Sequence, residues 1–342
     1  MNDIFAYTLE TWYASYGRQL PWRQTSDPYC IWLSEVILQQ TQVAQGLAYY
    51  NRFVSRFPDA QSLADASEDE VMLLWQGLGY YSRARNLHAA AKQIAQAGAF
   101  PDDYDSIRRL KGVGDYTAAA IASIAFGLPY AVLDGNVYRV LARYFGLQTP
   151  IDTSAGHKEF RMLADELLDR RHPALYNQAI MDFGALQCTP RSPRCQDCPL
   201  ADSCQALAAN LVESLPRKSR RQRVIDRYFT YLYISSPDGR LFIQRRGAGD
   251  IWQGLYQLPL IETPSPLSLQ DMALRFPGCD AELLVDGITH QLTHQLLHAQ
   301  CYAIRSSSYA ETVSDGLWVP LQNLQDYAMP QLLVRIIRKI SR

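Results

Sequence analysis

The first 210 residues carry apolar side chains mainly at helical spacing. Five segments repeat apolar residues three and four positions apart, which is the pattern of helices with one buried face. These segments are Ile31–Val43, Val71–Leu78, Tyr116–Phe126, Val137–Phe145 and Phe160–Leu168. Proline, glycine and aspartate residues between them mark turns. We therefore expect a mainly α-helical N-terminal domain.

The pattern changes after Leu211. The segment Leu215–Arg223 is polar and basic and has no apolar face, which is typical of a linker. Beyond it, short runs rich in β-branched and aromatic residues predict strands, and a final amphipathic run predicts a helix. The strands are expected at Tyr228–Ser235, Leu241–Gln244, His298–Arg305 and Gly316–Val319, and the helix at Met329–Ser341. We expect an α-helical domain over residues 1–214, a basic linker over 215–226 and an α+β domain over 227–342.

Length and charge narrow the class of protein. A chain of 342 residues exceeds the roughly 250–300 residues that one core serves well, which agrees with two domains. The net charge of −1 excludes a protein that binds nucleic acid through bulk charge alone, so any DNA contact must depend on local placement of basic residues. The chain has no basic and apolar leader and no apolar run of about 18–20 residues. We expect a soluble intracellular protein.

Four of the seven cysteines lie close together with the spacing C-x6-C-x2-C-x5-C. They are Cys188, Cys195, Cys198 and Cys204. A tight cysteine group in an intracellular chain binds metal more often than it forms disulfides. Four thiolates suit either zinc or an iron–sulfur cluster, and the chemistry of the residues alone leaves both open. The other three cysteines are expected to be ordinary buried thiols.

A glycine pair precedes one of the predicted helices. In Lys111-Gly112-Val113-Gly114, two glycines one residue apart permit a tight reversal between helices. The unpaired amides at the start of the next helix favour an anion. Such a loop can hold a DNA phosphate without reading the base sequence.

Two carboxylates occupy positions that suit acid–base chemistry. Glu35 shares a helix face with the apolar Ile31 and Leu38, so burial should raise its pKa and keep it protonated as a general acid. Asp134 stands where a helix begins near Gly135, which predicts a helix cap. A carboxylate at a helix N-terminus is expected to stay ionised, and it would then stabilise a nearby cation.

Together these motifs resemble the MutY-type adenine DNA glycosylases, which belong to the endonuclease III or helix–hairpin–helix superfamily. The resemblance extends over nearly the whole chain. It is carried by the hairpin and the cysteine spacing together with Leu20–Arg23, Ser34–Val43, Gly77–Leu87, Val132–Leu141 and Asn177–Ala179. It implies one 4Fe–4S cluster on the four cysteines and a Nudix-like C-terminal domain. The glutamate-rich Nudix motif is missing from residues 228–342, so we expect that domain to sense the lesion rather than hydrolyse phosphates.

The resemblance also implies an activity and roles for individual residues. The family removes adenine mispaired with 8-oxoguanine or guanine in double-stranded DNA, as a monomer and, for a bacterial member, in the cytoplasm at the nucleoid. Glu35 would protonate adenine N7, Asp134 would stabilise the oxocarbenium-like sugar, and Tyr116 and Asn136 would support them. The flipped adenine would be bound by Arg18, Trp22, Leu38 and Gln178. DNA contacts would come from Gln40, Thr41, Leu78, Tyr80, Lys111, Gly112, Val113, Gly114, Thr293 and His294.

Two positions distinguish this chain from its relatives. Bifunctional members of the superfamily carry a Schiff-base lysine where this chain has Tyr116, so we expect base removal without strand cleavage. Leu292-Thr293-His294 stands where family members often have Phe-Ser-His; threonine keeps the hydroxyl, but the aromatic ring is lost. The alternatives are a bifunctional glycosylase for pyrimidine lesions and a non-catalytic DNA-binding iron–sulfur protein. The histidines His290, His294 and His298 form either an amphipathic face or a metal site.

Overall fold

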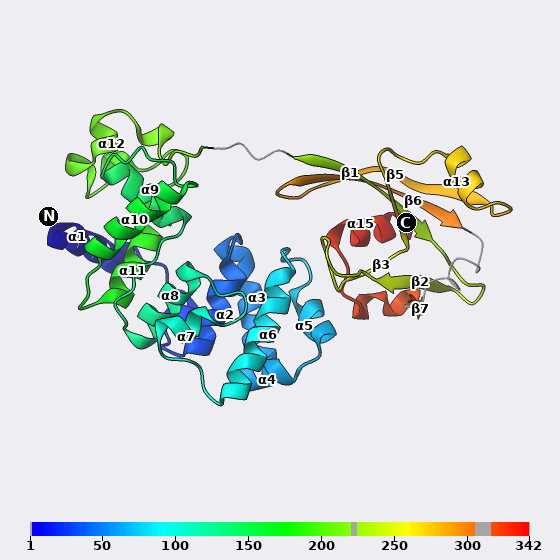
Figure 1. The fold of residues 1–342 in the computed structure, drawn as a ribbon, viewed down its shortest axis with the longest axis horizontal. Coiled ribbons are helices and arrows are strands. Elements are labelled where there is room, and N and C mark those ends of the chain that lie inside the picture. Colours follow the sequence, from blue (N-terminus) through cyan, green and yellow to red (C-terminus); the bar gives the residue numbers. More distant parts are fainter. Residues whose placement is uncertain (1, 220–223, 305–315, 342) are drawn as a thin grey trace. The chain divides into compact units, whose positions relative to one another are not determined.

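The computed structural model describes residues 2–219, 224–304 and 316–341 (Figure 1). Contacts divide the chain into two compact units, which are described separately. Unit 1 contains residues 1–65 and 86–221, and unit 2 contains residues 66–85 and 222–342. The basic residues Arg220, Arg221 and Arg223 of the expected linker lie outside the described residues. None of the described helices is both long and apolar enough to cross a membrane.

Unit 1 is helical, as the apolar spacing predicts. Its core joins α1, α8, α9, α10 and α11, and its fully buried side chains include Phe5, Leu9 and Phe160. The helices of unit 1 are α1 (Asn2–Tyr16), α2 (Pro28–Leu38), α3 (Val43–Arg56), α4 (Ala60–Asp65), most of α6 (Ser82–Ala97), α7 (Tyr104–Arg108), α8 (Asp115–Phe126), α9 (Gly135–Tyr144), α10 (Ser154–Leu167), α11 (Pro173–Asp182) and α12 (Gln205–Ala208). Short turns complete it: η1 (Pro21–Arg23), η2 (Phe183–Gln187), η3 (Cys195–Asp197), η4 (Ala201–Ser203) and η5 (Val212–Ser214).

Helix α8 occupies the middle of unit 1 because its side chains are small. Its sequence DYTAAAIASIAF lets α2, α7 and α11 pack closely around it. Gly114 caps its N-terminus, and Gly127 ends it with a left-handed φ of 65°. As a result, the start of α8 and the middle of α2 lie side by side, and these are the segments that contain Tyr116 and Glu35.

The expected helix Ile31–Val43 is wrong in one respect, because the structure divides it. Helix α2 ends at Leu38 and α3 begins at Val43, with a polar loop between them. Gln40 in this loop has a φ of 55°, in the left-handed region that non-glycine residues rarely adopt. The run Gln39-Gln40-Thr41-Gln42 offers no apolar side chain to a core, so nothing holds it in a continuous helix.

Unit 2 contains two sheets and has the expected α+β class. A four-stranded sheet has the order β4-β1-β6-β5, with β1 and β6 parallel, and a three-stranded sheet has the order β3-β2-β7. The strands are β1 (Ile225–Tyr233), β2 (Arg240–Arg245), β3 (Tyr256–Gln257), β4 (Leu260–Thr263), β5 (Ala281–Gln291), β6 (Gln295–Ile304) and β7 (Gly316–Pro320). Helix α15 (Gln331–Ile340) packs into the core between the sheets, while α13 (Leu269–Arg275) contributes Met272 to a smaller core.

The strand predictions near β1, β2, β6 and β7 and the closing helix are confirmed, with ends shifted by a few residues. Strands β3, β4 and β5 and helix α13 were not predicted. In particular, His290 is the last residue but one of the long strand β5 and His298 lies within β6, with His294 in the turn between them. The three histidines, four positions apart, therefore lie along a β-hairpin and not on one face of a helix.

Residues 66–85 pack with the C-terminal residues in unit 2. This segment contains α5 (Glu68–Trp75), which Ser67 caps through the amide of Glu70, and the loop that leads into α6. Arg245 forms an ion pair with Asp69 at 2.9 Å, and Arg85 donates to the carbonyl of Gln253 at 2.6 Å. No feature of the sequence predicted that a segment between two helices of unit 1 would join the C-terminal unit.

Candidate active site

Glu35 lies on the buried face of α2, as its apolar neighbours predicted. Asp27 caps this helix through the amide of Tyr29, and Pro28 takes the first position, where its missing N–H costs nothing. Only 8% of Glu35 is exposed, and its Oε2 accepts a hydrogen bond of 2.7 Å from the hydroxyl of Tyr116. Burial is the main reason that the pKa of Glu35 rises to about 7. The carboxyl is therefore suited to deliver a proton near neutral pH.

Asp134 is the N-cap of α9, which confirms the predicted cap. Its carboxylate accepts the amides of Asn136 at 2.9 Å and Val137 at 2.8 Å, and the side-chain Nδ2 of Asn136 at 2.7 Å. The sequence predicts that Asp134 stays ionised at the helix N-terminus. Burial opposes this and raises the pKa of Asp134 above its ordinary value, against these three N–H donors. The donors nevertheless stabilise the ionised form, whereas Glu35 has only the Tyr116 hydroxyl.

Asn136 connects Asp134 to the cysteine loop. Arg139, one turn further along α9, donates to the Oδ1 of Asn136 at 2.8 Å and to the carbonyl of Cys188 at 2.7 Å. Because the Arg139 guanidinium binds both Asn136 and the Cys188 carbonyl, it fixes the Asn136 side chain. Asn136 in turn fixes the orientation of the Asp134 carboxylate. Sequence reasoning missed Arg139, although it lies within the Val132–Leu141 motif.

A single cavity of about 850 Å³ in unit 1 joins the predicted catalytic and adenine-binding residues. Its volume falls in the usual range for small-molecule sites. The predicted residues that line it are Glu35, Asp134, Tyr116, Asn136, Arg18, Trp22, Leu38, Gln178, Gln40 and Thr41. They come from α2, α8, α9, α11 and the segments around η1 and after α2, which are distant in the sequence.

The wall of this cavity contains a buried ion pair that sequence reasoning did not identify. Asp182, at the end of α11, accepts hydrogen bonds from both Arg18 and Arg23. Beside it, the hydroxyl of Tyr13 donates to the Oε1 of Gln178 at 3.0 Å. An acid inside the otherwise apolar run Ala179–Phe183 was a signal for a buried pair, since a buried charge needs a partner.

The predicted hairpin lies between α7 and α8. Gly112 has a φ of 78°, and a Cβ there would come within 2.6 Å of the Cβ of Asn86, so this position requires glycine. A Cβ at Gly114, the cap of α8, would meet nothing within 4 Å. The backbone amide of Lys111 donates to Gln93 and the side chain of Val113 is buried. Any phosphate contact here therefore depends on the Lys111 ammonium and the amides that begin α8.

The remaining predicted DNA contacts meet within unit 2. Leu78, Tyr80, Thr293 and His294 line a second cavity of about 550 Å³ together with Trp252. The hydroxyls of Tyr80 and Thr293 are 2.7 Å apart and form a hydrogen bond. Tyr80 is 48% exposed and has a φ of 48°, whereas Leu78 is almost wholly buried. Strained backbone of this kind is concentrated at functional sites.

The four clustered cysteines line one small cavity next to α9. Arg143 donates from Nη1 to the Sγ of Cys188 at 3.4 Å, a contact that suits a thiolate carrying negative charge. Among the described residues, no three cysteine sulfurs lie within 4.8 Å of one another. A single tetrahedral zinc ion, with Zn–S bonds of about 2.3 Å, would bring them closer than that. The donor set fits the larger 4Fe–4S cluster.

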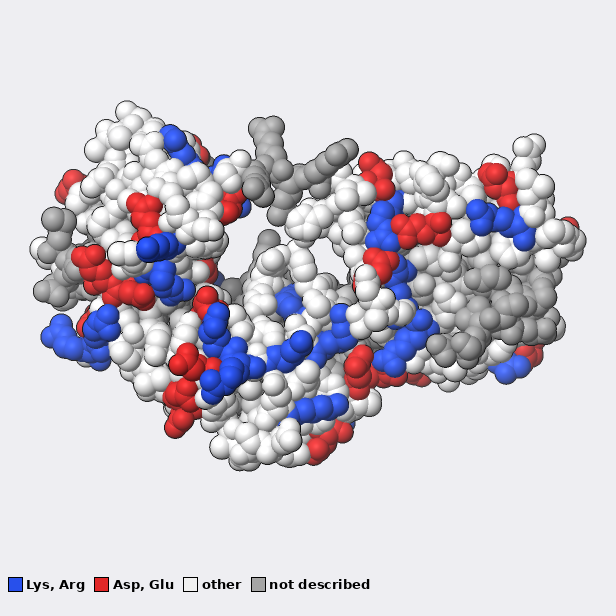
Figure 2. All heavy atoms as spheres, in the orientation of Figure 1, with Lys and Arg blue, Asp and Glu red and all other residues white. Residues whose placement is uncertain are grey.

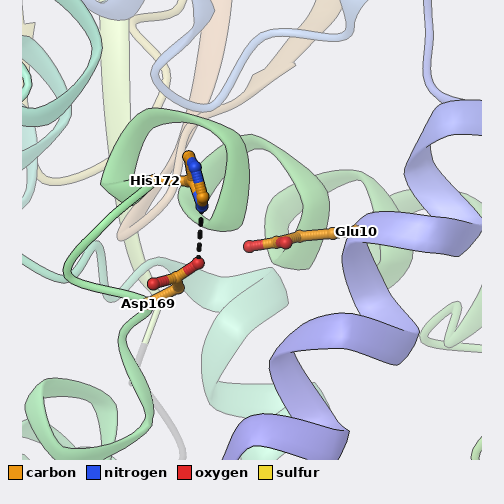
Figure 3. A group of neighbouring side chains, drawn as sticks. All are labelled: Glu10, Asp169 and His172. Atoms are coloured by element: carbon orange, nitrogen blue, oxygen red, sulfur yellow. Dashed lines mark hydrogen bonds and ion pairs between the residues drawn. The ribbon is translucent and has the colours of Figure 1, made fainter.

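The histidines of the hairpin and a separate acidic group have other partners. His290 accepts a hydrogen bond from Arg335, and His298 bonds Asp226 at 2.7 Å, so these histidines do not form the metal site considered above. In unit 1, Glu10, Asp169 and His172 bring their side chains together (Figure 3). The carboxylate of Asp169 accepts hydrogen bonds from the ring of His172 at 2.9 Å and from the backbone amide of Arg171. These bonds belong to the turn that leads into α11, and they account for the contact between Asp169 and His172.

Comparisons with known proteins agree with this geometry. Residues 33–164 match the HhH-GPD superfamily of base excision DNA repair proteins, residues 188–204 the iron–sulfur binding domain of endonuclease III, and residues 230–339 the NUDIX domain. Residues 188–204 therefore form an iron–sulfur binding segment, in which the four cysteines are the candidate ligands, and the C-terminal domain is Nudix-like.

Solved structures share the helical fold. A thermostable thymine-DNA glycosylase is 30% identical with a TM-score of 0.57, covering 61% of this chain and 97% of its own. An endonuclease III trapped with DNA is 22% identical with a TM-score of 0.53, covering 62% of this chain and 99% of its own. An adenine DNA glycosylase of Buchnera aphidicola subsp. Baizongia pistaciae is 32% identical over 99% of this chain and 97% of its own length. The chain belongs to the adenine DNA glycosylase family.

Proposed function

We propose that this protein is a monofunctional DNA glycosylase that removes adenine mispaired with 8-oxoguanine or guanine. The observation that carries the proposal is the buried Glu35, whose pKa is raised to about 7 in a cavity that it shares with Asp134. A protonated acid opposite a second carboxylate is the arrangement that cleavage of a glycosidic bond requires. The family to which the chain belongs supports adenine as the base.

The chain's own residues supply the steps of hydrolysis. Protonated Glu35 gives its proton to N7 of the adenine, which turns the base into a neutral leaving group. As the bond from C1′ to N9 breaks, Asp134 stabilises the positive charge that forms on the sugar. Water then adds to C1′ and gives up a proton, which returns to the Glu35 carboxylate. Asn136 holds the Asp134 carboxylate through the hydrogen bond of 2.7 Å from Nδ2. Cys188, Cys195, Cys198 and Cys204 would hold the cluster, which would cross-link the loop 188–204; within this loop the carbonyl of Cys188 accepts a hydrogen bond from Arg139.

The adenine can reach this cavity only if it swings out of the DNA duplex. Extrusion of a base costs a few kcal/mol, and less at a mismatch, which favours the proposed substrates. Gln40 and Thr41, in the loop that lines the cavity, would fill the vacated stack, and Gln40 has a left-handed φ of 55°. The segment Lys111–Gly114 would hold a phosphate at the N-terminus of α8.

Recognition of the opposite base is assigned to unit 2. Tyr80 and Thr293 present a hydrogen-bonded pair of hydroxyls at the second cavity, beside His294, and Leu78 lies in its wall. A hydroxyl pair of this kind can donate to or accept from the edge of 8-oxoguanine. Threonine keeps this function although Leu292 replaces the aromatic residue of many relatives.

Tyr116 makes the proposed enzyme monofunctional. Its hydroxyl bonds Glu35, and at this position a phenol cannot form the imine through which a lysine would cleave the strand. We also propose that the protein acts as a monomer on chromosomal DNA, at the nucleoid in the cytoplasm of a bacterium.

The test is single-turnover excision by cluster-loaded protein on labelled duplexes that hold adenine opposite 8-oxoguanine, guanine or thymine. Strand scission is scored with and without alkali, for the wild type and for Glu35→Gln. We expect scission only after alkali, only for the two mispairs, and none with Glu35→Gln. Scission without alkali would favour the bifunctional alternative, and tight binding without loss of adenine would favour the non-catalytic one.

A further inference from the structure

Asp182 is a fully buried carboxylate, and the steps above do not use it. Its side chain is 0% exposed. It accepts the amide and the Nε of Arg18, each at 2.9 Å, the Nη2 of Arg23 at 2.7 Å, and one further N–H from each guanidinium group. These bonds hold the pKa of Asp182 below its ordinary value although burial alone would raise it. A charge so completely enclosed is stable only with such partners.

Both arginines face the cavity that contains Glu35. The side chain of Arg18 is 28% exposed and that of Arg23 is 11% exposed, and each lines the cavity wall. Arg23 also lies over the ring of Tyr13, at 5.5 Å from its centroid, and Tyr13 in turn bonds Gln178. Planar guanidinium groups keep a fixed orientation when two of their N–H groups bind one carboxylate. Asp182 therefore holds the side chains of Arg18 and Arg23 in a fixed orientation in the cavity wall.

Charge balance gives Asp182 a second effect. Three charged or titratable groups act on Glu35 besides its own burial: Tyr116 from α8, Asp134 from α9 and Arg23 from η1. Arg23 is the cation among them, and its charge lowers the pKa of Glu35. Asp182 places a negative charge in contact with that cation, so part of its field is cancelled before it reaches Glu35.

We propose that Asp182 is a positioning residue for adenine excision: it fixes the guanidinium groups of Arg18 and Arg23 in the wall of the base-binding cavity and offsets their charge beside Glu35. This inference rests on the proposed function, because it assigns Glu35 as the acid. It adds a residue that touches neither the base nor the sugar and acts through the two arginines.

The experiment compares the pH dependence of single-turnover excision for the wild type, Asp182→Asn and Asp169→Asn. Asp169 is a matched control: it is also an aspartate near an end of α11, with 12% of its side chain exposed, but its arginine partner, Arg171, does not line the cavity as Arg18 and Arg23 do. In Asp182→Asn the charge of Arg23 is no longer offset. We expect the alkaline midpoint of the rate profile to fall by about one pH unit, and the rate above that midpoint to fall about tenfold. Asp169→Asn should keep the wild-type midpoint.

An equal midpoint in Asp182→Asn and the wild type, with cluster and fold intact, would overturn the proposal even if the rate were lower, because a purely structural role lowers the rate without moving the midpoint. Should Asp182→Asn fail to fold, Arg23→Met carries the test. Removing that cation should move the midpoint to higher pH, and an unchanged midpoint would again overturn the proposal.

A readout without DNA separates this inference from the proposed function. Infrared difference spectra between each protein and its Glu35→Gln counterpart report the C=O band of protonated Glu35 as pH varies. Its midpoint should be lower in Asp182→Asn than in the wild type. If the wild type removes no adenine, the proposed function fails, but the infrared midpoint still decides whether Asp182 acts on Glu35.

Discussion

Burial of Glu35 should make the folded protein less stable at alkaline pH, and Glu35→Gln tests this. The pKa of this carboxyl rises from an ordinary 4.5 to about 7, mainly because burial disfavours its charge. The folded protein therefore holds the proton more tightly than the unfolded chain does. Its stability is highest below the lower value, decreases as the pH rises through both values and remains reduced above the higher one. Glutamine has a similar size and no charge, so it removes this dependence.

The size of the effect follows from the two pKa values. They differ by about 2.5, and each pKa unit corresponds to roughly 1.4 kcal/mol, so ionised Glu35 costs about 3.5 kcal/mol. For a unit of about 200 residues, 1 kcal/mol changes the melting temperature by roughly 2–4 °C. Glu35→Gln should thus melt about 7–14 °C above the wild type at pH 8. At pH 5 the folded protein keeps Glu35 protonated while most unfolded chains have lost that proton, so the cost is about 0.8 kcal/mol and the difference only about 2–3 °C.

The assay is thermal unfolding at both pH values, followed by circular dichroism and by the visible absorbance of the cluster. Glu213→Gln provides the control, since Glu213 is exposed and lies outside the cavity. This variant should melt like the wild type at both pH values. A difference between Glu35→Gln and the wild type that is the same at pH 5 and pH 8 would refute the reasoning, because the burial of a titrating carboxyl must show itself as pH dependence.

Three further predictions follow from individual contacts. Tyr116→Phe removes a hydrogen bond that lowers the pKa of Glu35, so the alkaline limb of the excision profile should move to higher pH, as single-turnover rates would show. Arg139→Gln breaks the link between the cysteine loop and Asn136, which holds the Asp134 carboxylate, and excision should slow by about tenfold or more while cluster absorbance is retained. Thr293→Ala removes the hydroxyl that bonds Tyr80, and competition between duplexes should show the preference for 8-oxoguanine over guanine reduced by about threefold to tenfold.

Much of unit 1 could be predicted from the sequence because its helices follow local rules. The apolar face of α2 placed Glu35 inside the protein, and the position of Asp134 before Gly135 predicted a cap that the structure confirms. Both conclusions need only residues within one turn of the helix. The break after Leu38 was missed because the polar run of residues 39–42 contains no proline or glycine that would mark a turn.

The residues that were missed depend on contacts between distant segments. Asp182 is separated from Arg18 by 164 positions, and Tyr13 from Gln178 by 165, so no local pattern joins them. The effect of burial on the pKa of Asp134 was missed for a related reason: the N-terminus of α9 is a local feature, but burial depends on the whole unit. Strand β5 contains irregular pairing and a left-handed Gly287, which obscure the alternation on which strand prediction relies.

The membership of residues 66–85 in unit 2 has a consequence for synthesis of the protein on the ribosome. Tyr80 emerges more than 200 residues before Thr293, its hydrogen-bond partner. At roughly 5–20 residues per second, this segment waits about 10–40 s for that partner. Throughout that interval the helices of unit 1 can assemble while α5 and the loop after it lack their C-terminal contacts. A nascent chain stalled near residue 221 should therefore be open to proteases at this segment, and one released at its full length should be protected there.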